Sequence, residues 1–275
     1  MKVIAPLAAA FVLLAAFPSL AQWRNVPPDT KAPRTKSGDV DLEAPPPRHA
    51  NGRVSLEGVW MPNDNRYIRD LALDVGEAKV PYQPWARKLT DERKDGTHSR
   101  EDPDAHCLPQ GVPKIDYVSY PWKLVETPTS VVMMFETFTF WRQIFTDGRT
   151  PDPAAKPSWM GYSVGHWEGD TLVVETTQTK PNRHYYGVQM LDSVMSDQFR
   201  VVEQFTRTAP DQIRYRATVH DPVFTTPWTV EIFMHPQKGE LVEYACHEGN
   251  YGMRGLLSAA REEEKATEGI GRAHV

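Results

Sequence analysis

Residues 161–177, with the sequence GYSVGHWEGDTLVVETT, constrain the fold most, because they predict a β-hairpin. An extended arm over 161–167 leads into a tight turn at 168–170, and a β-branched arm over 171–177 runs back. Gly169 provides the backbone freedom that the turn requires, and the aspartate after it tolerates a left-handed conformation. Similar patterns recur before and after this hairpin, so we expect one antiparallel sheet folded around an apolar interior.

Other segments rich in β-branched and aromatic residues also predict strands, and the total is about nine in meander order. A meander of this length is expected to close, because open sheet edges promote aggregation. The fold class that the sequence predicts is therefore all-β: an antiparallel meander barrel with a C-terminal helix over 253–266 and a short helix over 82–93. The other strands are expected at 54–61, 117–126, 129–136, 137–147, 199–207, 212–220, 228–235 and 240–247.

The N-terminal residues predict export. A basic start at Met1-Lys2 precedes an almost unbroken apolar run, and Ser19-Leu20-Ala21 fits the small-x-small rule for signal peptidase. We expect a signal peptide over residues 1–21, cleaved before Gln22, and a periplasmic or secreted mature protein. The alternative is an uncleaved membrane anchor, for which the apolar run is short.

Residues 22–53 are rich in proline and contain few apolar side chains, so we interpret them as an extended, largely unpacked linker. A single domain is expected over residues 54–275. The net charge is −5 and there is no basic block, which argues against nucleic acid as a partner. The expected partner is a small-molecule ligand or substrate, because small barrels hold one such molecule.

The chain has two cysteines, Cys107 and Cys246, which in an oxidising compartment predict a disulfide. Closing so long a loop stabilises a fold by about 5 kcal/mol in the chain-entropy model. An alternative is a copper or zinc site formed with the adjacent His106 and His247. Because neighbouring residues of a strand point to opposite faces, we predict no metal site. Unpaired thiols are the third possibility.

Acid–base chemistry has several candidate residues. His166 lies in the hairpin with Tyr162 and carboxylates, and a histidine in such a setting can shuttle protons near neutral pH. The alternative is that His166 is a solvent-exposed residue near the turn and has no chemical role. Glu136 and Arg142 occur in the most apolar segments, where a charge must be paired or face a polar cavity. The candidate catalytic residues are His166, Glu136, Arg142, Glu203 and Tyr162.

The residue numbers alone do not decide which face of the sheet these side chains occupy. Glu136 and Arg142 share a face if the strand is unbroken, and a turn between them would separate them. Glu203 is either an inward carboxylate or a member of an outward polar row. His220-Asp221 is interpreted as a turn feature, and the Gly161-x-Ser163-x-Gly165 spacing as a chance match to a nucleophile elbow, because a hairpin follows it.

Aromatic and sulfur-containing side chains are expected to line a cavity inside the barrel, and small barrels hold one such ligand. The first functional hypothesis is therefore a protein that binds a small apolar or aromatic molecule, without a cofactor. The second is a cofactor-free lyase, isomerase or hydratase in the same pocket, and the third is an envelope protein with a filled barrel. The candidate ligand-binding residues are Tyr117, Met133, Met134, Phe138, Trp141 and Trp228.

Two resemblances extend these expectations. Gly58-x-Trp60 resembles the opening strand of lipocalins and related calycin barrels, whose tryptophan closes the barrel floor. The chain also resembles a set of uncharacterised exported bacterial proteins, most specifically through Trp167-Glu-Gly-Asp-Thr-Leu-Val-Val174. That set commonly has a histidine at the positions of Tyr162 and Met195, so chemistry that depends on those histidines is in doubt here. The resemblance implies export and brings no established activity.

Overall fold

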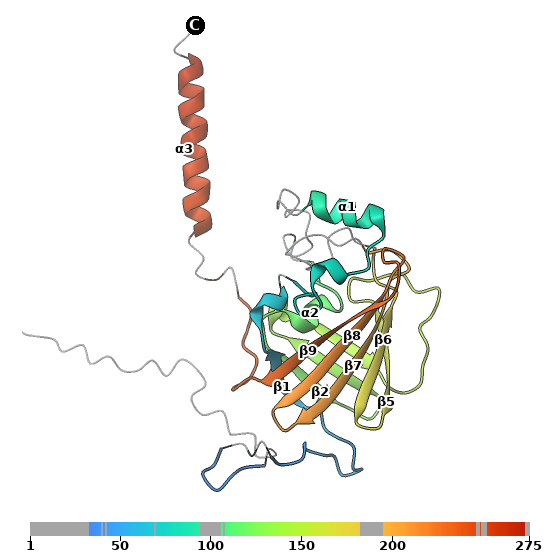
Figure 1. Ribbon diagram of the computed structural model, residues 1–275. Helices are drawn as coiled ribbons and strands as arrows, with labels where there is room; N and C mark the ends of the chain where they lie inside the picture. The colour runs from blue at the N-terminus through green and yellow to red at the C-terminus, as the bar shows by residue number, and fades with distance from the viewer. Residues whose placement is uncertain are drawn as a thin grey trace, which may run out of the picture.

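The computed structural model describes residues 33–39, 41, 43–68, 70–93, 106, 108–181, 195–245, 248 and 252–272. In this part of the chain, nine strands form a closed barrel in the order of the sequence (Figure 1). Neighbouring strands are antiparallel, except for a short parallel pairing between β4 (Trp141–Phe145) and β5 (Tyr162–Glu168). The predicted meander barrel is thereby confirmed. The strands are β1 (Gly58–Pro62), β2 (Trp122–Glu126), β3 (Ser130–Phe135), β4 (Trp141–Phe145), β5 (Tyr162–Glu168), β6 (Thr171–Thr177), β7 (Arg200–Ala209), β8 (Gln212–His220) and β9 (Trp228–Pro236).

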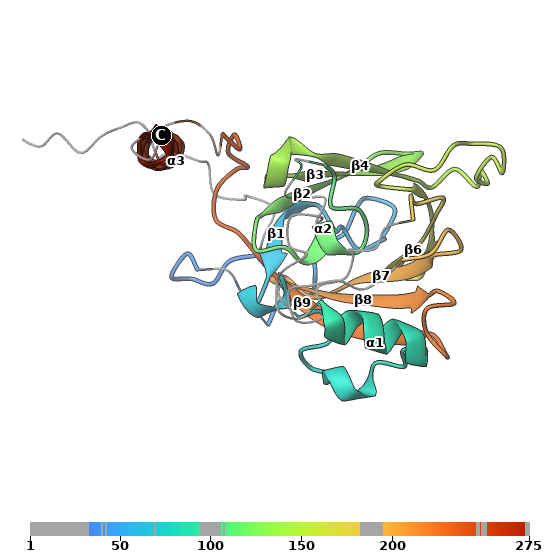
Figure 2. The same ribbon diagram turned by 90° about the horizontal axis from the view of Figure 1, so that it is seen from above.

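Closure comes from β1, which pairs with β2 on one side and with β9 on the other. Burial alternates along β7 and β8, so every second side chain enters the interior and the others face outward. The described helices are η1 (Asn65–Ile68), η2 (Glu77–Lys79), α1 (Pro84–Glu92), α2 (Lys114–Tyr117), η5 (Thr137–Thr139) and α3 (Gly252–Arg272). Figure 2 shows α2 within the ring of strands, whereas α3 stands clear of the barrel.

The central hairpin is β5 and β6, and it has the predicted turn. Glu168 pairs with Thr171, and Gly169 has a φ of +60°. Gly165 has a different role, because a Cβ there would lie 2.8 Å from Cγ2 of Ile144 on β4. Glycine at this position therefore lets β5 approach β4 where the two strands meet in parallel.

Packed side chains fill the barrel interior. Trp60 is buried, its indole Nε1 donates to the carbonyl of Leu56 at 3.0 Å, and the guanidinium of Arg207 lies 4.9 Å from its ring centroid. This arrangement closes the end of the barrel that carries the β7–β8 turn. The largest fully buried side chains are Trp60, Trp122, Tyr117, Tyr215, Phe205, Leu56, Leu71, Ile115, Leu124 and Met133.

The segment before β1 also contributes to the barrel, although its first residues were assigned to the linker. Arg48 donates to both carboxylate oxygens of Asp170, at 3.0 and 2.7 Å. Arg53 donates to Glu126 at 2.6 Å, and its guanidinium lies 4.0 Å from the ring centroid of Trp167. Packing against the barrel therefore begins before residue 54.

Two strand predictions were wrong. Residues 240–245 are not a strand; they pass outside the barrel, where Lys123 contacts Glu240 at 2.6 Å. Residues 137–139 form η5, and Phe138 has a φ of +52°, so the segment predicted as one strand over 137–147 contains a turn before β4.

Some expectations fall outside the described residues. The signal peptide, Cys107, Cys246 and His247 are among them, so the structure bears on neither cleavage nor the disulfide. None of the helices in the described ranges has the length and apolar character that crossing a bilayer requires.

Candidate functional site

A cluster of polar side chains lies inside the barrel around Arg142. This arginine points inward from β4 and only 3% of it is exposed. Its Nε donates to the hydroxyl of Ser163 at 3.1 Å, and Nη2 donates to the hydroxyl of Thr176 at 2.7 Å. Nη1 donates to Glu203 Oε1 at 3.1 Å, and Nη2 to Glu203 Oε2. The guanidinium and the carboxylate of Glu203 thus form a bidentate pair.

Glu203 enters the cluster from β7 and is fully buried. Its Oε1 also accepts from the hydroxyl of Tyr215 on β8, at 2.9 Å. The structure therefore confirms the inward option for this glutamate. The serine of the Gly-x-Ser-x-Gly spacing is Ser163, which is buried between Arg142 and Thr176 and is held as a structural hydrogen-bonding group.

A second carboxyl group, that of Asp116 on α2, lies 3.3 Å from Nη1 of Arg142. Burial, and then the charge of Glu203, raises the pKa of Asp116 well above its ordinary value. A raised pKa favours the protonated form of Asp116, which leaves Glu203 as the carboxylate that pairs with Arg142. Within the described residues, its Oδ1 has no hydrogen-bonding partner.

The charge on Arg142 is maintained by the same neighbours. Burial alone would lower its pKa, but the neighbouring carboxyl groups, Glu203 first and then Asp116, raise the pKa above its ordinary value. All three side chains are at least nine-tenths buried and are enclosed by the core. The buried charge of Arg142 is balanced by its pairing with Glu203. None of these three side chains has direct access to solvent.

The other candidate catalytic residues lie away from this cluster. His166 is on the outer face, where its Nε2 is 2.9 Å from Glu168 Oε1 and both side chains are mostly exposed. Tyr162 is on the same face and stacks on Phe145, with ring centroids 5.3 Å apart. Glu136 precedes η5 and accepts from the backbone N–H of Val242 at 3.2 Å. The structure brings together Arg142 and Glu203 only.

The candidate ligand-binding residues divide between the interior and the exterior. Tyr117, Met133 and Trp228 are buried in the core. Trp141 is 64% exposed on the outer wall, directly opposite Met134 in the β3–β4 pairing. Phe138 lies outside as well, with its ring centroid 5.0 Å from that of Tyr244. These six side chains therefore do not line one cavity.

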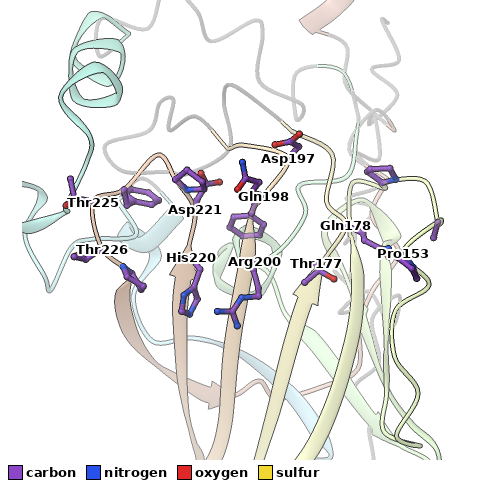
Figure 3. Close-up of a pocket in the computed structure, with 16 residues that line it drawn as sticks. Pro153, Thr177, Gln178, Asp197, Gln198, Arg200, His220, Asp221, Thr225 and Thr226 are labelled. Carbon is purple, nitrogen blue, oxygen red and sulfur yellow. The ribbon is translucent and has the colours of Figure 1, made fainter.

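A solvent-accessible groove lies instead on the outer wall, at the barrel end opposite the β5–β6 and β7–β8 turns (Figure 3). Its volume is about 660 Å³. The ends of β6 and β8 and the start of β7 provide its floor, and the loops over 153–157 and 221–227 provide its walls. The lining residues are Pro153, Ala155, Pro157, Thr177, Gln178, Asp197, Gln198, Phe199, Arg200, His220, Asp221, Pro222, Phe224, Thr225, Thr226 and Pro227.

Two nitrogen-bearing side chains lie side by side on the floor. Arg200 and His220 are direct partners in the β7–β8 pairing, and both project from the outer face. Arg200 donates through Nη1 to Glu175 Oε2 at 2.9 Å. Partial burial, and then the charge of Arg200, lowers the pKa of His220, while Glu175 raises it. The lowered pKa favours the neutral imidazole, in which one ring nitrogen donates a hydrogen bond and the other accepts one.

Asp221 supports the loop that forms one wall. Its Oδ1 accepts from the N–H of Val223 and its Oδ2 from the N–H of Ser196, both at 2.9 Å. These contacts agree with the interpretation of His220-Asp221 as a turn feature rather than a dyad. Burial raises the pKa of Asp221. His220 itself is the groove residue that this interpretation overlooked.

Comparison of the chain with protein families, with characterised proteins and with solved structures finds no significant match. In the described ranges, no three histidine, cysteine, aspartate or glutamate residues are grouped closely enough to hold a metal ion. The geometry of the groove and of the interior is therefore the basis for a functional assignment.

Proposed function

We propose that this protein binds a small apolar or aromatic molecule, and that the binding site is the groove on the outer wall of the barrel. The observation that carries the proposal is the groove itself, whose volume of about 660 Å³ lies within the range of small-molecule sites. Its proline residues are rigid apolar surfaces in the two loops, and Arg200 and His220 provide polar groups on the floor. This combination suits a ligand with an apolar body and one polar end.

The barrel interior is the alternative location for a ligand. It contains large packed side chains together with the paired Arg142 and Glu203, so a ligand there would have to displace well-packed groups. The groove requires no such displacement. For this reason we place the ligand outside the β-barrel rather than within it.

The proposed acid–base enzyme remains a second candidate because of one observation. His220 pairs directly with Arg200 across β7 and β8, and its lowered pKa favours the neutral imidazole, which is the setting of a general base next to an electrostatic stabiliser. We further propose that the protein acts after export, with residues 1–21 removed as a signal peptide. Both proposals add to the binding function and neither is needed for it.

The test is native mass spectrometry of the protein purified from the cell envelope of its own host, in which we expect a retained small-molecule adduct. Thr226→Trp should fill the groove, because Thr226 lines it and is exposed. Thr208→Trp is the matched control, an exposed threonine at the opposite end of β7. We expect Thr226→Trp to lose the adduct and Thr208→Trp to keep it.

An adduct that survives Thr226→Trp would place the ligand elsewhere and contradict the proposal. If no adduct is found, a thermal-shift screen of aromatic and aliphatic compounds replaces it as the readout. If Thr226→Trp removes the stabilising effect of none of these compounds, that result would also contradict binding in the groove.

A further inference from the structure

The hydrogen-bond donors on the groove floor indicate the chemical class of the ligand, in addition to its size. On the basis of the proposed binding function, we infer that the groove selects an aromatic carboxylic acid, whose carboxylate binds to Arg200 and whose ring lies between the proline walls.

Arg200 uses only one side of its guanidinium in the protein. Nη1 donates to a single oxygen of Glu175, and within the described residues no other acceptor is found for this side chain. A planar guanidinium has five N–H donors in a fixed fork, so the remaining edge can hold a carboxylate through two parallel hydrogen bonds. Arg142 shows the contrast, because all of its nitrogen atoms already have acceptors inside the barrel.

His220 extends the same floor. Because it pairs directly with Arg200 across β7 and β8, its imidazole lies beside the guanidinium, and Figure 3 shows both side chains on the floor. The charged groups around it are Arg200, Glu175, Asp197 and Asp221. Both carboxylate oxygens of Asp221 accept backbone N–H groups, so this aspartate is committed to the loop.

The walls favour a flat ring over a flexible chain. Pro153 and Pro157 come from one loop, and Pro222 and Pro227 come from the other, so rigid apolar rings border the floor on two sides. A planar aromatic body loses little conformational entropy when it is held between such surfaces. The volume of about 660 Å³ admits a two-ring compound.

Asp197 is the feature that favours a different ligand. Asp197 is exposed, and Figure 3 shows it above Arg200, on the segment that leads into β7. An ammonium group would bind there. The experiment must therefore separate an acidic ligand from a basic one and from a neutral one.

The test uses isothermal titration calorimetry with three naphthalene probes that differ in the charge of their one substituent: 2-naphthoate, 2-naphthamide and 2-naphthylmethylammonium. We expect the full mature chain to bind naphthoate about tenfold or more tightly than naphthamide, as a charge-assisted bidentate contact implies. Arg200→Gln should remove this preference. Arg216→Gln is the matched control, because Arg216 is another outward strand arginine that contacts a glutamate, Glu231, at 3.5 Å, and it does not line the groove.

Equal binding of naphthoate and naphthamide would overturn the inference about the acid while leaving binding in the groove intact. Tighter binding of the ammonium probe would overturn it in favour of recognition by Asp197. A preference for naphthoate that Arg200→Gln does not change would also overturn it. If no probe binds up to millimolar concentration, the inference fails, and the adduct test with Thr226→Trp decides separately whether the groove binds a ligand at all.

Discussion

Removal of Arg142 should strongly destabilise the barrel. In Arg142→Met the carboxylate of Glu203 keeps the hydroxyl of Tyr215 but loses its bidentate partner within a fully buried site. Breaking a buried ion pair by removing one partner costs about 3–5 kcal/mol, because the other charge stays buried and uncompensated. We expect the free energy of unfolding to fall by about that amount.

The double variant Arg142→Met with Glu203→Gln tests the cause of this loss. It removes both charges, and the glutamine can still accept from Tyr215, so much of the stability should return. Urea unfolding followed by tryptophan fluorescence measures all variants, and the double-mutant cycle gives the coupling energy. The surface pair Arg216 and Glu231 is the control, for which we expect a coupling below about 1 kcal/mol.

Two results would refute the reasoning. One is a loss of less than about 1 kcal/mol in Arg142→Met, since that is the range of exposed pairs. The other is strict additivity of the two interior substitutions, which would mean that the two charges do not depend on each other.

Three further predictions follow from the same structure. Because burial and the charge of Glu203 raise the pKa of Asp116, the native state keeps a proton that the unfolded chain releases near about pH 3.9. The resulting stabilisation is complete below that pH and is lost as the pH rises from there through the native pKa. The free energy of unfolding relative to Asp116→Asn should therefore fall as the pH rises above about 4, by at most about 1.4 kcal/mol per pH unit, and a difference that stays constant with pH would contradict this prediction. Gly165→Ala should destabilise by about 1–3 kcal/mol in urea unfolding through its contact with Ile144, and an unchanged midpoint would argue against a close approach of β5 and β4. Intact-mass measurement of the exported protein should show a mature chain that begins at Gln22, and a retained N-terminus would instead support a membrane anchor.

Much of the barrel could be predicted because local chemistry and global topology agree. Gly169 and its neighbours specify the β5–β6 turn, and the alternation along β7 and β8 specifies which side chains enter the core. Because buried charges are normally paired, we could predict from the sequence that Arg142 has a partner, and this prediction was correct. Sequence alone did not identify that partner, because Glu203 is on a strand that comes beside Arg142 only after the barrel has closed.

The errors have physical causes as well. Residues 240–245 have the composition of a strand, but β9 already pairs with β1, so the closed sheet has no edge left for another strand. For Glu136 and Arg142 the second of the two alternatives holds, because η5 interrupts the strand between them. The groove could not be found from local patterns, since its floor and walls come from segments far apart in the sequence.

A crystal structure of the protein with 2-naphthoate tests the central claim most directly. We expect density for the compound on the outer wall, with its carboxylate within hydrogen-bonding distance of Arg200 and the interior pair of Arg142 and Glu203 unchanged. Density inside the barrel, with that pair separated, would contradict the claim that this barrel binds its ligand in the groove.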